Sequence, residues 1–186
     1  MEKSSRGTDI VLLFDNYSVA SSDLHESFKN AGYDVPTIVI GDDGFLPDDV
    51  VNVFEYFLGD DFKNNYDKPR FFNQLLVPKF WEITGTNTEG SVRNREQERA
   101  RIFYAEPKNK RFIKVVDWLD EKGNVRCSDH YNKCGRLYAR TTFNKISQKV
   151  NKTYFDVDGK EKIVENFVTG DIILNGDDGI HFFEIP

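Results

Sequence analysis

The first part of the chain carries a hydrophobic pattern typical of alternating strands and helices. Residues 10–14 form a continuous apolar run and residues 37–40 form a second one, and each run predicts a buried strand. Between them, Leu24, Phe28 and Ala31 recur at helical spacing and predict a helix with one apolar stripe. The order strand, helix, strand predicts a βαβ unit with parallel strands.

The predicted helix has signals at both of its ends. Asp23 with Glu26 three positions later is typical of a capping pair, and Gly32 stands where a C-terminal glycine is expected. Residues 41–49 form an acidic, turn-rich loop after the second predicted strand. Residues 50–66 fit both a short helix and an alternating strand, so the pattern leaves the structure of that segment open.

From residue 71 onward, runs of aromatic and β-branched residues alternate with turn residues. Such regular spacing is typical of an antiparallel β-meander. Gly123 and Gly135 are 12 residues apart, Gly135 and Gly159 are twice 12 apart, and the turn missing between them falls at residues 144–147. The predicted strands are residues 75–84, 99–106, 111–120, 125–131, 136–143, 148–156, 160–169, 171–175 and 179–185.

Two of these strands and one of the turns carry further signals. Pro78 lacks a backbone N–H, which confines the strand at 75–84 to an edge or a bulge. Asp158 followed by Gly159 is typical of a two-residue hairpin turn. The strand at 111–120 is apolar on both faces, so another part of the protein must cover it.

Strict alternation in the strands at 125–131 and 136–143 predicts one buried face and one solvent-facing face. Arginine and tyrosine side chains exposed on a sheet are typical of protein interfaces, whereas packing within the sheet is the alternative for each aromatic ring. We therefore predict a polypeptide-binding surface on the solvent-facing side. The predicted solvent-facing set is Asn124, Arg126, Ser128, His130, Arg136, Tyr138, Arg140 and Thr142, and the candidates for contact with acceptor or partner are Arg126, His130, Arg136, Tyr138 and Arg140.

Composition and charge narrow the class of protein. The chain has 186 residues, 39% of them hydrophobic and 30% charged, as expected for a globular domain. Its net charge of −6 argues against general affinity for nucleic acid or anionic membranes. The arginines between residues 93 and 101 alternate with glutamates and fit an exposed, salt-bridged strand. The chain ends directly after an apolar run, which indicates a fragment of a longer polypeptide.

Motifs for catalysis or cofactor binding are missing from the sequence. It has no glycine-rich dinucleotide loop, no phosphate-binding loop and no G-x-S-x-G or H-E-x-x-H motif. Cys127 and His130 should point to opposite faces of one strand, so a metal site with Cys134 is not expected. The acidic turns at 41–44 and 175–179 lack the ligand spacing of an EF-hand. We expect no metal, no cofactor and no catalytic residue, and free thiols in a cytosolic chain.

Eight collinear segments that extend over most of the chain carry a further signal. They are residues 13–15 (LFD), 23–25 (DLH), 36–40 (PTIVI), 43–47 (DGFLP), 77–83 (VPKFWEI), 116–123 (VDWLDEKG), 129–132 (DHYN) and 164–175 (VENFVTGDIILN). In these segments the chain resembles the GtfB family, the glycosylation-stabilising partner in the accessory Sec system of Gram-positive bacteria.

The resemblance implies an α+β fold. Residues 1–66 would be the N-terminal βαβ segment of a Rossmann-like lobe, and residues 67–186 an extended antiparallel β-meander domain. It also implies a cytoplasmic, non-catalytic subunit that binds a serine-rich repeat adhesin polypeptide. This subunit would stabilise the catalytic O-GlcNAc glycosyltransferase that adds N-acetylglucosamine to the adhesin. Peripheral membrane association of the full-length protein stays open.

Two other functions remain as alternatives. The chain could be the N-terminal part of an active retaining GT-B glycosyltransferase, or a structural or oligomerisation domain. The catalytic partner in this family has a glycine-rich loop after its first strand, whereas residues 16–22 of this chain contain no glycine. That departure favours the non-catalytic member.

Overall fold

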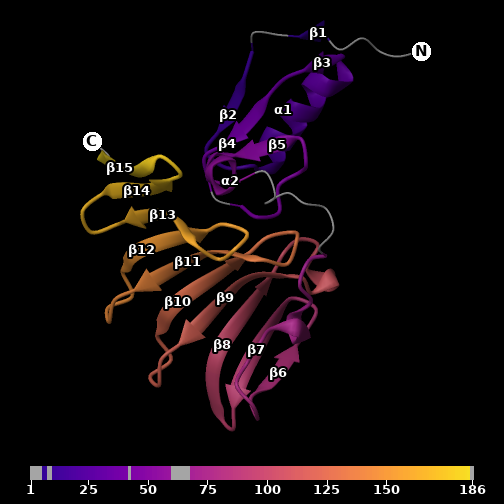
Figure 1. Cartoon of the computed structure of the whole chain (residues 1–186). Coiled ribbons are helices and arrows are strands. Elements are labelled where there is room, and N and C mark those ends of the chain that lie inside the picture. Colours follow the sequence, from indigo (N-terminus) through magenta and orange to yellow (C-terminus); the bar gives the residue numbers. More distant parts are fainter. Residues whose placement is uncertain (1–5, 8–9, 42, 60–67, 185–186) are drawn as a thin grey trace. The chain divides into compact units, whose positions relative to one another are not determined.

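The computed structural model describes residues 6–7, 10–41, 43–59 and 68–184 (Figure 1). The chain divides into two compact units, residues 1–57 and 58–186. A small parallel sheet with a helix belongs to the first unit, and a ten-stranded antiparallel sheet belongs to the second, so the predicted α+β fold is confirmed. The expected domain boundary between residues 66 and 67 lies at the edge of a segment, 60–67, outside the described residues.

The N-terminal part contains a three-stranded parallel sheet in the order β2-β4-β5, and a pair in which β1 lies parallel to β3. The βαβ prediction is confirmed. The segment from residue 50, for which the sequence pattern fitted both a strand and a helix, begins with a strand that is followed by a helix. No helix in the described part of the chain is long and apolar enough to span a bilayer. The elements are β1 (Arg6–Gly7), β2 (Leu12–Phe14), α1 (Val19–Asn30), β3 (Tyr33–Asp34), β4 (Thr37–Val39), β5 (Val50–Asn52) and α2 (Val53–Leu58).

Helix α1 begins earlier than the capping pair predicted. Ser18 is the N-cap, and its Oγ accepts a hydrogen bond from the Ser21 backbone N–H at 3.2 Å. Asp23 therefore lies inside the helix, because the serine hydroxyl already satisfies one of the free N–H groups of the first turn. At the other end, Gly32 has φ +85, in the left-handed conformation expected just after a helix.

The buried face of α1 also differs from the predicted stripe. Ser21 and His25 are its buried residues, whereas Leu24 is 45% exposed. The Tyr17 hydroxyl lies 3.0 Å from His25 Nδ1, so a polar contact replaces part of the expected apolar one. Phe28, whose ring meets the Tyr33 ring edge-on, is half-buried, whereas Leu24 and Ala31 are exposed, so the predicted apolar stripe is wrong at two of its three positions.

One face of the parallel sheet holds the core of the N-terminal unit. Val39, Leu46 and Val50 pack there with Phe14. Leu13 points to the other face and is 61% exposed, so the prediction that the whole apolar run is buried is wrong. A parallel strand that is apolar on both faces needs cover on both, and this unit covers only one of them at Leu13.

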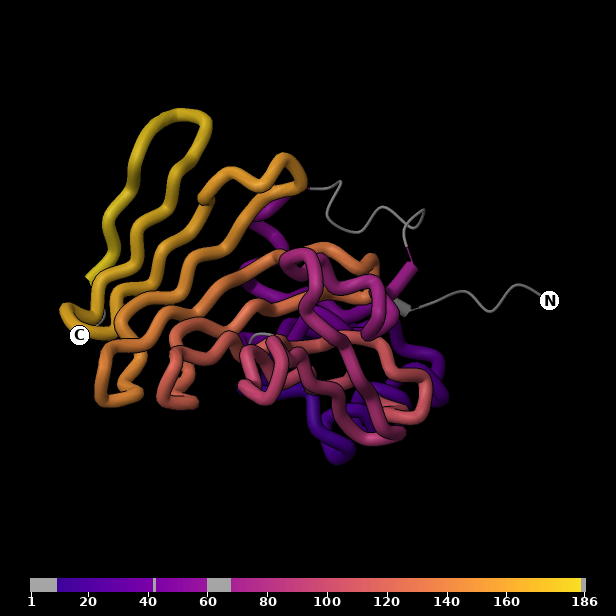
Figure 2. The backbone as a smooth tube through the Cα atoms, turned by 90° about the horizontal axis from the view of Figure 1, so that it is seen from below, coloured from indigo at the N-terminus to yellow at the C-terminus, as the bar shows by residue number. Residues whose placement is uncertain are grey.

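The second unit is a serial meander in which every strand pairs with its neighbours in the sequence (Figure 2). The predicted strands are confirmed from residue 99 onward with small changes at their ends. The strands are β6 (Glu82–Gly85), β7 (Glu89–Asn94), β8 (Gln97–Tyr104), β9 (Ile113–Leu119), β10 (Val125–Tyr131), β11 (Leu137–Phe143), β12 (Lys149–Phe155), β13 (Glu161–Asn166), β14 (Asp171–Gly176) and β15 (Gly179–Glu184).

The start of the meander departs from the prediction. Only the last residues of the expected strand at 75–84 pair, as β6, and Pro78 lies outside it. The short 3-10 helix η2 (Phe72–Gln74) precedes that segment. The arginine-rich run is a hairpin rather than one strand, because Arg95 turns the chain between β7 and β8 with φ +55.

Four successive hairpins, from β9 to β13, share one turn that recurs every 12 residues. In each turn, the side-chain oxygen of the first residue accepts hydrogen bonds from the backbone N–H groups two and four positions later, at 2.8–3.1 Å. The residue three positions later has positive φ. The first residues are Asp120, Asn132, Asn144 and Asp156, and the positive-φ residues are Gly123, Gly135, Ser147 and Gly159.

The repeated turn confirms one sequence prediction and corrects another. The turn expected at residues 144–147 is present, with Ser147 in the place of a glycine at φ +60. The Asp158-Gly159 hairpin is longer than predicted. Asp156 N donates to Lys160 O at 2.9 Å and Gly159 N donates to Asp156 O at 3.0 Å, which leaves three residues in the loop. The Asp156 side chain stabilises this longer turn.

Residues 70–83 cover the apolar strand β9, as its pattern required. Ile113 N donates to Arg70 O at 2.8 Å, which fixes the start of the covering segment against the sheet. Ile102, Ile113 and Val116 are fully buried beneath it. The cluster is completed by Leu75, Val92, Ala100, Tyr104 and Tyr131, with Phe72, Val77, Trp81, Ile83, Trp118 and Leu137 packed against it.

Candidate binding surface

The register of β10 against β11 divides the five predicted contact residues between two faces of the sheet. Asp129 pairs with Arg140, and His130 pairs with Ala139. Arg140 therefore shares a face with Asp129, which the alternation had placed on the buried side. A β-bulge between His130 and Tyr131 shifts the register by one residue, and a one-residue shift exchanges the faces. The predicted single solvent-facing set is wrong.

Asp129 is a buried carboxylate at the centre of one face. Only 3% of the residue is exposed. It accepts hydrogen bonds from Arg140 Nε at 2.6 Å, from Arg140 Nη2 at 3.0 Å and from Trp118 Nε1 at 2.8 Å. The hydrogen bond to Asp129 raises the pKa of the Arg140 guanidinium. Arg140 is thus a partly exposed cation held in a fixed orientation.

His130 lies on the opposite face among buried polar groups. Its Nε2 is 3.0 Å from Thr141 Oγ1, and its ring meets the Tyr138 ring edge-on at a centroid distance of 6.3 Å. Tyr138 is 4% exposed and Ser128 is 6% exposed, so these two side chains are packed rather than displayed. Ser128 Oγ donates to Asp117 Oδ1 at 2.5 Å. The packing alternative holds for Tyr138.

Arg136 lies at the β10–β11 turn, beside a cavity of about 460 Å³. Lys68, Arg70 and the buried Cys134 also line this cavity. Arg70 Nε donates to the Gly135 carbonyl at 3.1 Å, and its guanidinium lies 5.2 Å from the centroid of the Tyr131 ring. Burial raises the pKa of Tyr131 to about 12, so its hydroxyl is neutral at physiological pH.

Of the five candidate contact residues, Arg126 is exposed, whereas the other four are half-buried or buried. It lies at the other end of the strands from Arg136 and lines a larger cavity of about 850 Å³. The structure thus places Arg126, Arg136, Arg140 and the His130–Tyr138 pair at four separate positions of the sheet.

The two cysteines are free thiols, Cys127 in strand β10 and Cys134 in the turn that follows it. Cys127 is half-buried, and burial raises the pKa of its thiol. Cys127 pairs with Thr142, whereas His130 lies on the opposite face. Among the residues that the structure describes, no group of three or more His, Cys, Asp and Glu side chains could hold a metal ion.

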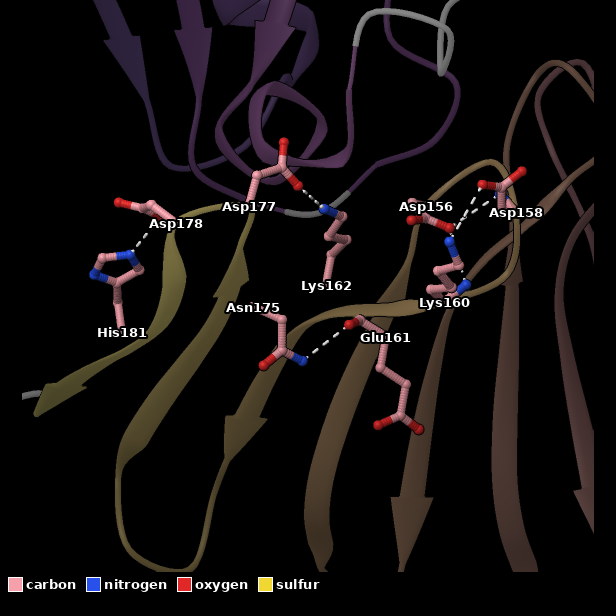
Figure 3. A network of polar contacts seen from close by, with 9 residues as sticks. All are labelled: Asp156, Asp158, Lys160, Glu161, Lys162, Asn175, Asp177, Asp178 and His181. Carbon is pink, nitrogen blue, oxygen red and sulfur yellow. Dashed lines mark hydrogen bonds and ion pairs between the residues drawn. The ribbon is translucent and has the colours of Figure 1, made fainter.

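Acidic and basic side chains alternate at the ends of the last strands (Figure 3). Lys162 Nζ lies 3.0 Å from Asp177 Oδ1, and His181 Nε2 lies 2.9 Å from Asp178 Oδ1. The hydrogen bond from His181 lowers the pKa of Asp178. Both carboxylates of the acidic turn therefore contact cationic or hydrogen-bonding side chains rather than converging on one point, as calcium ligands would.

Sequence reasoning missed the roles of Asp129 and Trp118. One signal was available, because Asp129 is a charged residue on the side of the β10 strand that alternation placed in the core. A buried carboxylate requires a partner. Arg140, directly across the next hairpin, was already among the candidates.

The fold defines a class of protein in which a parallel βαβ unit of Rossmann type precedes a long serial β-meander. Residues 11–57 match the family model of the GtfB N-terminal domain, and residues 81–184 match that of the GtfB middle domain. The chain belongs to the GtfB family.

Two curated relatives and one solved structure agree with this assignment. The chain is 51% identical over 168 residues to the UDP-N-acetylglucosamine–peptide N-acetylglucosaminyltransferase stabilizing protein GtfB of Streptococcus gordonii, covering 90% of this chain and 37% of the relative. It is 44% identical over 175 residues to the protein of the same name from Streptococcus agalactiae, covering 94% and 39%. The chain thus spans less than two fifths of the length of these relatives.

The solved structure is a crystal structure of a GtfA/B complex bound to UDP and GlcNAc. It shares 49% sequence identity with this chain and superimposes with a TM-score of 0.88. The match covers 94% of this chain and 39% of the other. Both units of the fold therefore have counterparts in a single experimentally determined chain.

Proposed function

We propose that the chain is part of a cytoplasmic, non-catalytic subunit that stabilises a partner O-GlcNAc glycosyltransferase and binds its Ser/Thr-rich adhesin acceptor. The observation that carries this proposal is the 51% identity, over 90% of the chain, to a protein named for stabilising a peptide N-acetylglucosaminyltransferase. The TM-score of 0.88 to a chain from a GtfA/B complex supports the same partner.

The long meander supports a role in binding polypeptides. Strand β15 pairs with β14 on one side, and in the described part of the chain no strand pairs with its other side. Extended segments of a partner bind such edges through backbone hydrogen bonds. Ile180, Phe182 and Phe183 on this strand are all more than half exposed, which provides apolar area for such a partner.

The loop after β2 supports the non-catalytic part of the proposal. A glycosyltransferase that binds a sugar nucleotide needs a backbone that can approach the diphosphate closely, and glycine permits that approach. Residues 16–22 carry side chains at every position. Ser18 caps helix α1, and Ser21 in the first turn of that helix donates a hydrogen bond to the Asn16 carbonyl at 3.0 Å.

Co-purification tests the proposal. The 186-residue chain and its full-length parent are each mixed with the unglycosylated Ser/Thr-rich repeat polypeptide and with the partner transferase. We expect the parent to retain both and to slow thermal inactivation of the transferase. Retention of neither partner by the chain or the parent would refute the proposal. A repeat polypeptide with its Ser and Thr replaced by Ala is the matched control.

Sugar transfer by the parent alone distinguishes the main alternative. We expect no transfer of N-acetylglucosamine from its UDP-sugar without the partner enzyme. Transfer by the purified parent would show an active glycosyltransferase. Light scattering with and without the partner distinguishes the proposed function from a purely structural or oligomerisation role. A domain that only self-associates would leave the transferase unbound.

A further inference from the structure

The larger cavity lies at the end of the sheet that carries the β9–β10 and β11–β12 turns, the lower end in Figure 1. Its volume is about 850 Å³, large enough for several side chains of a partner. Leu119, Val125 and Phe143 give it an apolar part. The cationic side chains that line it are Arg99, Lys122, Arg126 and Lys145.

Two β-bulges direct arginines to this cavity. The pairing of β7 with β8 skips Arg99, and the pairing of β9 with β10 skips Arg126. A bulge leaves one residue unpaired and changes the direction of its side chain, and bulges are enriched beside functional sites. Two strands that are not adjacent, β8 and β10, thus each contribute an unpaired arginine to the same cavity.

Arg99 has an unsatisfied donor at this position. Its guanidinium lies over the Trp81 ring at 5.6 Å, which holds the plane in place. Its Nε is buried and has no hydrogen-bond partner in the structure. A buried donor without an acceptor is costly, so an acceptor supplied by a ligand would stabilise the site.

The acidic residues of the cavity do not neutralise it. Asp120 is bound within its own turn, where Oδ1 accepts from the N–H groups of Lys122 and Asn124 at 2.8 and 2.9 Å. These backbone hydrogen bonds, first that of Asn124, lower the pKa of Asp120. Glu121 is the second acid, against four cations, in a chain with a net charge of −6. The cavity is therefore a local cationic site on an acidic protein.

We propose that this cavity binds an acidic segment of a partner polypeptide. A carboxylate side chain of that segment lies between Arg99 and Arg126, and an apolar neighbour packs against Leu119 and Phe143. Charge complementarity and the unsatisfied Arg99 donor favour a carboxylate. The inference deepens the proposed function, on which it rests for the source of the polypeptide.

Peptide binding by the full chain tests this inference. The probe is a short synthetic Ser/Thr-rich peptide with two Glu residues flanking one Leu, and its control replaces both Glu by Gln. We expect the Glu peptide to bind more tightly in fluorescence anisotropy and to lose affinity as salt is added. Arg126→Gln should raise its Kd about five-fold, which corresponds to a solvent-accessible ion pair at the upper end of its usual strength.

Matched variants make the result specific. Lys160→Gln removes another exposed cation, from a turn at the opposite end of the sheet, and should leave the Kd unchanged. Arg99→Gln should weaken binding as Arg126→Gln does. If Arg99→Gln fails to fold, because its stacking on Trp81 is lost, the Arg126 result decides alone.

Three results would overturn the inference. They are equal binding of the Glu and Gln peptides, an unchanged Kd in Arg126→Gln, and complete displacement of the peptide by a short single-stranded oligonucleotide, which would show a general polyanion site. Co-purification with transferase and repeat polypeptide is measured on the same proteins. Retention of both partners without a Glu preference refutes only the cavity assignment, whereas a Glu preference without either partner refutes only the proposed function.

Discussion

The two halves of the meander are held together in different ways. Strands β6–β9 are covered by residues 70–83, and Ile102 and Val116 are fully buried between them. Strands β10–β13 are joined by the turn that recurs every 12 residues, and by polar pairs such as Asp129 with Arg140. Burial of apolar area beneath a covering segment stabilises the first half, whereas the second half combines buried side chains such as Tyr154 and Ile163 with the recurring turns and polar pairs.

This difference explains where contact surfaces are available. A sheet face covered by its own chain cannot receive a partner. In the second half, turns and cross-strand pairs hold the strands in position. Hydrogen bonds can therefore orient its polar side chains while these side chains stay accessible to a partner. Arg140, oriented by Asp129 and 43% exposed, is the clearest case.

A large-to-small substitution in the covered half should give the largest effect. Ile102→Ala removes buried methyl groups from a fully enclosed site and should lower the free energy of unfolding by about 2–5 kcal/mol. Urea unfolding followed by the fluorescence of Trp81 and Trp118 measures it. The control Ile146→Ala, at a residue 73% exposed in a turn of the second half, should stay within about 0.5 kcal/mol. Equal losses in both variants would contradict the comparison.

Removal of the buried carboxylate tests the second half in the same way. Asp129→Ala leaves Trp118 Nε1 and the Arg140 guanidinium without their acceptor, and should cost about 1–3 kcal/mol. Asp158→Ala is the matched control, because that carboxylate is mostly exposed and its ion pair with Lys160 is long at 3.7 Å. A loss at Asp129 no greater than at Asp158 would show that the buried pair does not hold β10 to β11.

The sequence was sufficient for the strands of the second half because their turns carry local signals. Gly123, Gly135 and Gly159 marked the spacing, and residues 144–147 were identified as a turn without a glycine. The first half lacked such signals. Strand β7 was missed because its hairpin turns at Arg95, a residue type with no turn preference, and Pro78 was assigned to a strand that begins later.

The positive-φ position of the recurring turn should show a smaller effect. Gly159 has φ +77 and open space beside it, so strain and not a clash decides the outcome. Gly159→Val should cost about 1–2 kcal/mol, because a β-branched residue is unfavourable in this conformation. Gly159→Asn should cost clearly less, since asparagine tolerates it. Equal urea midpoints for the two variants would show that the turn is different in solution.

The turn that lacks glycine offers the reverse change. Ser147 adopts φ +60, where the other three turns have glycine. Ser147→Gly should stabilise the chain by about 0.5 kcal/mol. Glycine removes the strain of the left-handed conformation from the folded state, and this gain exceeds the free-energy cost of the more flexible unfolded chain. Differential scanning calorimetry can resolve the change. A lower melting temperature would mean that the serine hydroxyl contributes more than its backbone costs.

The candidate site was less predictable than the fold, and the register explains why. Alternation identifies which residues share a strand face, but the bulge at His130 and Tyr131 decides which faces of β10 and β11 coincide. Bulges leave little signal in a single sequence. Alternation was enough to include Arg126 among the candidates, but its position in the cavity depends on a bulge in β10, and that of Arg99 depends on a second bulge in a distant strand.

The recurring turns should differ in how their stability responds to acid. Hydrogen bonds from backbone N–H groups lower the pKa of Asp120, so its charged form is favoured in the folded chain. Its contribution to stability is therefore present above the pKa of the unfolded chain and is lost as the pH falls through the lower folded value.

Asn132 and Asn144 accept the equivalent hydrogen bonds through an amide oxygen that does not titrate. Asp120→Asn should hence make this turn independent of pH, and the stability of the variant should fall less than that of the wild type on acidification below about pH 4. NMR titration of the Asp120 carboxyl, with urea midpoints at neutral and acidic pH, measures both quantities. An ordinary pKa for Asp120 would show that its carboxylate does not form the turn's hydrogen bonds in solution, and would remove the likeness between this turn and its three successors.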